Sequence, residues 1–153
     1  MEWDQFVFKK IHRLVTFARS QKPDPERVAR AVALEEISPR LTSLARLLCG
    51  NAITLHPSEE VGGYKGTSFF LPRLYDRGDS REANEAFFLF RTLFLYGQYT
   101  LRHVWTDHNN HTYEASVTKA QEQAEEVLHF LSKEFAAFPD LYRSVLNQEK
   151  SFQ

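Results

Sequence analysis

The stretch ANEAFFLFRTLFLYGQYTLRHVW, residues 83–105, decides the fold that this sequence predicts. Its polar side chains are few, and Asn84, Arg91 and Gln98 follow one another at intervals of seven residues, which places them on one ridge of an α-helix. The rest of the circumference is aromatic or aliphatic. A helix that is apolar around most of its surface is enclosed by other elements, so we expect residues 83–105 to form the central helix of a domain.

Two details of this segment add to that expectation. Asp79-Ser-Arg-Glu82 resembles a capping box, which predicts a helix start at Asp79. Gly97 lies inside the helix, where glycine costs about 1 kcal/mol relative to alanine. We therefore expect another helix to approach closely at Gly97.

The flanking segments also repeat apolar residues with a helical period. Asp24 followed by Pro25, and Ser38 followed by Pro39, are typical of helix starts, and Gly50 is typical of a helix end. Residues 117–138 carry the most regular apolar stripe in the chain. We therefore expect helices over residues 3–19, from Asp24 to about Ile37, from Ser38 to Gly50, from Tyr113 to Phe138, and after Asp140.

Residues 51–72 are the one place where alternation replaces helical periodicity. NAITLH at 51–56 is followed by GGYKGTSFFLP at 62–72, which reads as a strand, a glycine-rich loop and a second strand ended by proline. The sequence thus predicts a single, predominantly α domain over residues 1–153, with five or six helices in a bundle and one small β-hairpin at about 51–72.

The composition excludes several classes of function. Nineteen basic and 20 acidic residues give a net charge of −1, without the basic excess that is typical of binding to nucleic acid or anionic lipid. The sequence indicates no signal peptide and no membrane-spanning segment, and the single cysteine, Cys49, is compatible with a reducing cytoplasm. Thirteen Phe, six Tyr and two Trp indicate a large core, a partner surface, or both.

No catalytic constellation is evident, so we expect neither enzymatic activity nor a cofactor. Cys49 ends a leucine-rich helix, where a buried and unreactive thiol is expected. Lys65 precedes Gly66 rather than following it, and a strand comes next, so the glycine-rich loop is not a phosphate-binding loop. One alternative stays open, which is a small metal- or ligand-binding protein that uses the loop histidines His103, His108 and His111.

Residues 52–105 resemble the N-terminal region of the nitric-oxide-reductase activation (NorD) and Rubisco-activation (CbbO) proteins. The resemblance consists of the strand at 52–56, the turn at 63–66, the strand ending in Leu71-Pro72, and the helix with an early asparagine, Asn84, before its aromatic run. It covers about a third of the chain. It implies a helical N-terminal domain whose longer relatives carry a von Willebrand A domain and work with a hexameric MoxR-type AAA+ ATPase on a client enzyme. The metal-adhesion motif of those relatives is not present in this sequence, so this chain is either a piece of a longer protein or a free-standing relative.

This resemblance, with the surplus of aromatic side chains, predicts an adaptor domain that binds the ATPase, the client enzyme, or both. The expected contact residues are the hairpin tip, with Val61, Tyr64 and Lys65, and the segment after it, with Arg73, Leu74 and Tyr75. A third hypothesis is a structural domain that dimerises through the stripe at 117–138.

Overall fold

The computed structural model describes residues 24–59, 62–102 and 113–150; the expected helix over residues 3–19 lies outside them. In chain order the elements are α2 (Pro25–Arg30), β1 (Val32–Ala33), α3 (Leu34–Cys49), β2 (Thr54–Ser58), β3 (Gly63–Lys65), β4 (Ser68–Pro72), β5 (Leu74–Tyr75), α4 (Arg81–Thr100), α5 (Tyr113–Glu134) and α6 (Phe138–Lys150).

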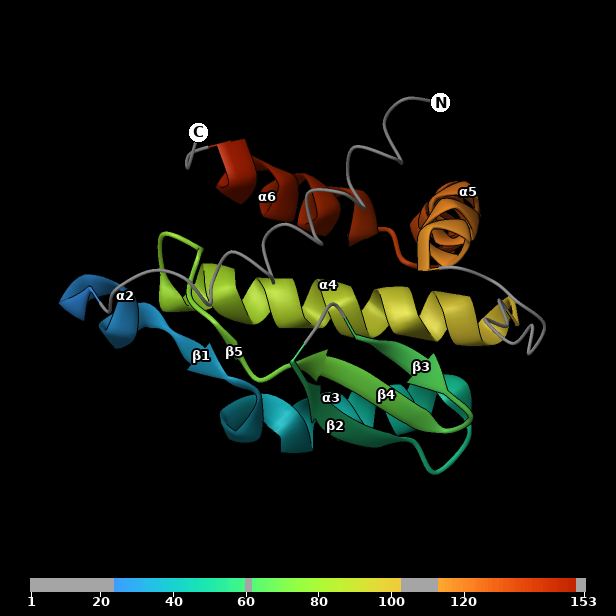
Figure 1. Ribbon diagram of the computed structural model, residues 1–153, viewed down its shortest axis with the longest axis horizontal. Helices are drawn as coiled ribbons and strands as arrows, with labels where there is room; N and C mark the ends of the chain where they lie inside the picture. The colour runs from blue at the N-terminus through green and yellow to red at the C-terminus, as the bar shows by residue number, and fades with distance from the viewer. Residues whose placement is uncertain (1–23, 60–61, 103–112, 151–153) are drawn as a thin grey trace.

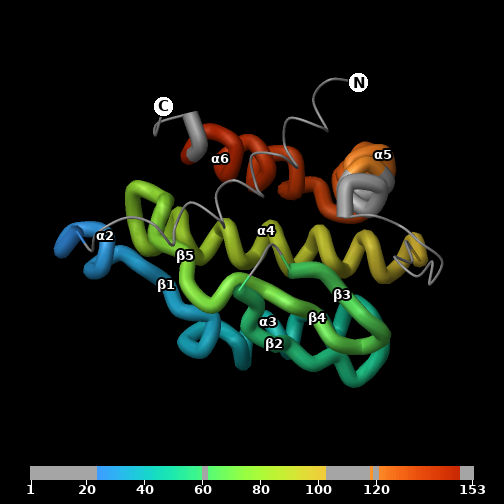
Figure 2. The backbone as a smooth tube through the Cα atoms, in the orientation of Figure 1, coloured from blue at the N-terminus to red at the C-terminus, as the bar shows by residue number. Residues whose placement is uncertain are grey.

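Helix α4 is the centre of the fold, as its sequence predicts. Figure 1 shows it running across the middle of the molecule, with α5 and α6 on one side and α3 with the small strands on the other. The tube in Figure 2 shows the same arrangement of layers. Every residue from Phe90 to Gln98 is buried, which is about two and a half turns of helix without a solvent-facing side. Burial of these side chains therefore joins both layers into one core.

Gly97 of α4 lies close against α5. A Cβ on residue 97 would lie 2.7 Å from Val127 Cγ1 and 3.4 Å from Leu131 Cγ. The expected reason for a glycine inside this helix is confirmed. Val127, Leu131 and Phe138 are buried in the core, so this part of the stripe packs against α4 and is not a surface available for dimerisation.

The polar ridge of α4 is also enclosed. Asn84 is 0% exposed, Arg91 3% and Gln98 4%. Desolvation lowers the pKa of Arg91 to about 10, and its guanidinium carbon lies 5.6 Å from the centre of the Phe94 ring. These side chains are consequently part of the interior.

The strands correct the expected fold class. The domain is not a predominantly α bundle with one hairpin but a mixed α/β fold with two small sheets, of order β1-β5 and β2-β4-β3. β3 and β4 form an antiparallel hairpin, whereas β2 pairs with β4 in parallel, with Thr54 opposite Ser68 and Ser58 opposite Pro72. Residues 51–72 contain all three strands of one sheet, and the second sheet joins residues that are more than 40 positions apart in the sequence.

The outer edge of β2 offers few groups for further pairing. Thr54 N–H donates to Thr67 O, so the backbone groups of Thr54 face β4. Because these groups alternate in direction along a strand, those of Ile53, Leu55 and Pro57 face the outer edge. Ile53, immediately before the strand, already has both groups occupied, since its N–H donates to Asn51 O and its carbonyl accepts from Arg46 Nε at 2.9 Å. Pro57 has no N–H to donate. Ile53 and Pro57 therefore offer little for the addition of another strand.

Two of the helix caps predicted from the sequence are confirmed, and the other predicted boundaries differ from those in the structure. Asp24 caps α2 by accepting from Glu26 N–H, and Gly50 ends α3 with a φ of +67°. Ser38-Pro39 does not start a helix, however, because α3 begins at Leu34 and contains Pro39. Val32, expected in the second helix, lies in β1. The cap of α4 is Ser80, one residue after the expected Asp79, and it accepts from Ala83 N–H.

Candidate interaction surface

The hairpin tip offers less surface than its sequence predicts. Lys65 is exposed at the end of β3, but the half-buried Tyr64 ring packs edge-on against Phe69 and Tyr99, with ring centres 6.3 and 6.0 Å away. Desolvation raises the pKa of Tyr64, with a smaller contribution from Tyr99. Val61 lies outside the described residues. Lys65 is thus the fully exposed side chain among the described contact residues of the tip.

The second group of expected contact residues lies at the far end of β4. Arg73 is exposed and forms a 3.6 Å ion pair with Glu59, and Leu74 is 51% exposed. Tyr75 is 5% exposed and stacks on Phe87, with ring centres 3.7 Å apart, so it is part of the core while β1 is in place. Because β4 spans about 3.3 Å per residue, Lys65 and Arg73 lie roughly 17 Å apart. The expected contacts therefore form two separate sites.

Exposed apolar side chains favour the second site. The large hydrophobic side chains with the highest exposure in the described part of the chain are Val28 (63%), Leu47 (80%) and Leu74 (51%). Val28 lies on α2, which leads into β1, and Leu74 lies on β5, which pairs with β1. Leu47 lies apart on α3. We call residues 24–33, which contain α2 and β1, the N-terminal arm.

Polar contacts attach the arm to the start of α4. The buried Asn84 donates from Nδ2 to Arg30 O at 2.8 Å and accepts at Oδ1 from Gly78 N–H at 2.6 Å. Arg27 forms a 3.1 Å ion pair with Asp76, in which both side chains are largely shielded from solvent. Asn84 thus connects the last turn of α2, the loop before α4 and α4 itself.

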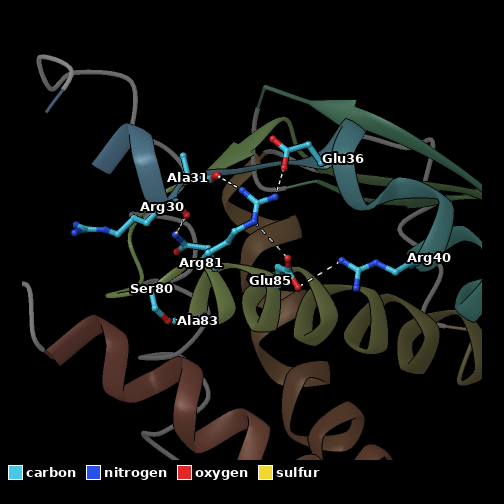
Figure 3. Close-up of polar contacts among 9 residues, drawn as sticks. Arg30, Ala31, Glu36, Arg40, Ser80, Arg81, Ala83 and Glu85 are labelled. Atoms are coloured by element: carbon cyan, nitrogen blue, oxygen red, sulfur yellow. Dashed lines mark hydrogen bonds and ion pairs between the residues drawn. The ribbon is translucent and has the colours of Figure 1, made fainter. Parts of the chain in front are cut away.

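Arg81 is the centre of a second, exposed network. Figure 3 shows its guanidinium between the arm and α3, donating to Ala31 O at 3.3 Å and to the Glu36 carboxylate. Glu85 lies 3.7 Å from Arg81 and 3.4 Å from Arg40. The hydrogen bond from Arg81 is the main reason why the pKa of Glu36 is below its ordinary value, and the same bond raises the pKa of Arg81. Sequence analysis missed this network because its members come from separate segments.

Two open hollows flank α6. One, of about 610 Å³, lies between α5 and α6, with Leu128, Tyr142 and Leu146 among its lining residues and Glu125, His129 and Arg143 beside them. The other, of about 510 Å³, lies between α6 and the start of α4 and is lined mainly by polar groups such as Asp79, Ser144 and Asn147. His129 and Ser132 both line the first hollow, and the Ser132 hydroxyl donates to Leu128 O at 2.7 Å.

The described residues do not form a metal centre. In residues 24–59, 62–102 and 113–150, no three His, Cys, Asp or Glu side chains are placed to hold a metal ion. His103, His108 and His111 lie outside these ranges. Burial raises the pKa of Cys49 to about 11, so its thiol is protonated at neutral pH. On the exposed face of the β2–β4–β3 sheet, Thr54 Oγ1 lies 3.0 Å from His56 Nε2. Neither hollow includes this pair.

Comparison with known proteins gave no match: no family model, no curated protein and no solved structure is significantly similar to this chain. In the described part of the chain, no helix has both the length and the apolar character needed to span a membrane.

Proposed function

We propose that this chain is a non-catalytic protein-recognition domain, an adaptor that works in the cytoplasm with a MoxR-type AAA+ ATPase and its client enzyme. The proposal extends the resemblance of residues 52–105 to the NorD and CbbO proteins. The observation that carries it is the exposed Leu74, next to Arg73 on a short ribbon whose other face is packed into the core.

The geometry of the ribbon suits an anchor residue. Tyr75 stacks on Phe87 and fixes the backbone of β5, so the neighbouring Leu74 side chain is held on the opposite side with little freedom to lose on binding. Ala33, its partner across the ladder, is small and leaves the Leu74 side chain accessible. Arg73 and Glu59 supply charges of both signs beside this apolar side chain, as at the polar rim of a protein interface.

The test is binding of the purified chain to the MoxR-type ATPase encoded nearest to its gene, measured by biolayer interferometry. Leu74→Asp should weaken binding at least about tenfold, because a carboxylate would have to be desolvated at the anchor position. Leu47→Asp is the matched control, since Leu47 is even more exposed but lies on α3. Equal loss in both variants, or binding that neither changes, would contradict the assignment of the site. If the unchanged chain does not bind the ATPase, the proposed function is wrong.

A further inference from the structure

The N-terminal arm has few buried side chains with which to attach to the rest of the domain. Of residues 24–33, Val32 is the one whose side chain is buried, and none of the six residues of α2 is buried. The other attachments described above are polar, and those of Arg81 lie at the surface. Exposed ion pairs contribute little to stability and weaken with salt. An element with few buried apolar contacts is expected to open locally before the core does.

The arm covers a specific feature, which is the free side of β5. Among the described strands, β1 is the only ladder partner of β5, with Val32 opposite Tyr75 and Ala33 opposite Leu74. The ladder is completed by Leu34 N–H, which donates to Arg73 O at 2.9 Å. When β1 lifts away, the backbone of Arg73 and Tyr75 loses its hydrogen-bond partners, and the site of Val32 beside the Tyr75 ring becomes vacant.

We propose that β5 is a strand-acceptor site, and that an extended apolar segment of a partner protein binds it by replacing β1. This inference rests on the proposed recognition role and names the mode of that recognition. The arm itself shows the chemistry of the occupant. It needs a β-branched side chain such as valine directed at Tyr75, a small residue next to it beside Leu74, and a preceding carbonyl placed to accept from Arg81 as Ala31 O does.

The proposal explains why Leu74 and Tyr75 differ so strongly in exposure. In the closed domain the partner reaches Leu74 alone. In the open domain both faces of β5 and its backbone become available. The Leu74 side chain can then act as an anchor while the backbone of β5 pairs with the partner strand. Only molecules with an open arm can bind the partner strand, so the apparent affinity falls in proportion to the fraction of open molecules. Contacts that hold the arm closed therefore control binding.

A cross-strand disulfide can lock the arm. Since Leu34 and Arg73 form a hydrogen-bonded pair, the adjacent pair of Ala33 and Leu74 is not hydrogen-bonded, and in such pairs the side chains are closest. The test protein is the full chain with Cys49→Ser, Ala33→Cys and Leu74→Cys. The probe is a fluorescent peptide of residues 25–35, PERVARAVALE, whose binding is followed by anisotropy. Its control is the same peptide with Val32→Asp.

The peptide should bind the reduced protein and lose at least about tenfold in affinity when the disulfide forms, and the control peptide should bind neither form. Arg27→Met in the reduced protein removes the ion pair to Asp76 and should strengthen binding several-fold. In hydrogen exchange of the unmodified chain, the Leu34 amide should exchange at least about a hundredfold faster than amides in the middle of α4.

Three results would overturn the proposal: equal binding to the oxidised and reduced proteins, no binding even to the Arg27→Met protein, or a Leu34 amide that exchanges as slowly as α4. A dimer that forms with concentration and is abolished by the disulfide would show that a second copy, not a different protein, is the occupant. Because the peptide assay contains no ATPase, its failure leaves the proposed function standing, and failure of ATPase binding leaves the strand-acceptor site standing.

Discussion

Gly97 of α4 faces Val127 of α5 so closely that a Cβ on residue 97 would lie 2.7 Å from Val127 Cγ1. Gly97→Ala gains about 1 kcal/mol of helix propensity, but overpacking at this contact costs about 1–3 kcal/mol. We expect a net decrease of up to about 2 kcal/mol in the free energy of unfolding in urea. With Val127→Ala as the background, the same change should be neutral or stabilising. An unchanged cost in that background would mean that the Val127 contact is not the cause.

Asn84 is the second position at which a substitution should be costly. Asn84→Ala removes hydrogen bonds to Gly78 N–H and Arg30 O and leaves both groups without their partner in a buried site. We expect a loss of about 2–4 kcal/mol in the free energy of unfolding. Glu122→Ala, on the exposed side of α5, is the control and should stay within about 0.5 kcal/mol of the unchanged protein. A loss of similar size in both variants would show that the two hydrogen bonds are not what makes Asn84 important.

The glycines at 62 and 66 allow strain and steric overlap to be measured separately. Both have positive φ, +78° and +59°. A Cβ on Gly62 would lie 2.1 Å from Phe70 O, whereas a Cβ on Gly66 meets nothing within 4 Å. Gly66→Ala should therefore cost about 1 kcal/mol for the left-handed conformation alone, and Gly62→Ala clearly more, because the main chain of β4 would have to move. Thermal unfolding of the two variants gives the comparison, and equal melting temperatures would contradict it.

Glu36 should make stability depend on pH in the acid range. Its pKa is lower in the folded chain, mainly through the hydrogen bond from Arg81, so its contribution is present above the ordinary glutamate pKa of about 4.3 and is lost as the pH falls through the lower folded value. The difference in free energy of unfolding between Glu36→Gln and the unchanged chain should be largest near neutral pH and disappear in acid. Glu35→Gln, one residue earlier and also exposed, is the control for removing one carboxylate from this turn. A pH-independent difference for Glu36→Gln would indicate a packing effect.

Much of the helical frame could be predicted from local sequence. Residues 83–100 are apolar around most of the helix, which predicts an enclosed central helix, and Asp24 and Gly50 have the chemistry that their cap positions require. Gly97 could be interpreted because glycine inside a helix has a known cost. These are properties of single segments, so they can be derived without knowing what packs against them.

The predictions that the structure corrects are those in which tertiary contacts override the local preference of the sequence. Pro39 is tolerated inside α3 because Ile37 and Leu41, on either side of it, are both buried in the core. Val32 fits a helical period, yet it pairs with Tyr75, 43 residues later, and β2 pairs with β4 in parallel although they are close in sequence. Tyr64 was expected to project from the hairpin, but it packs on Tyr99, which no local pattern indicates.

The outer edge of β2 has a consequence for assembly size. A protein that recognises partners by exchanging strands risks open-ended growth, since each added strand can present a new edge to the next molecule. Here Arg46 occupies the carbonyl of Ile53, and Pro57 has no N–H to donate, so a further strand would gain little by pairing with β2 at these two positions. The β5 ladder extends over two residues only. A partner that replaces β1 would cover this short edge, and growth from β2 would be disfavoured.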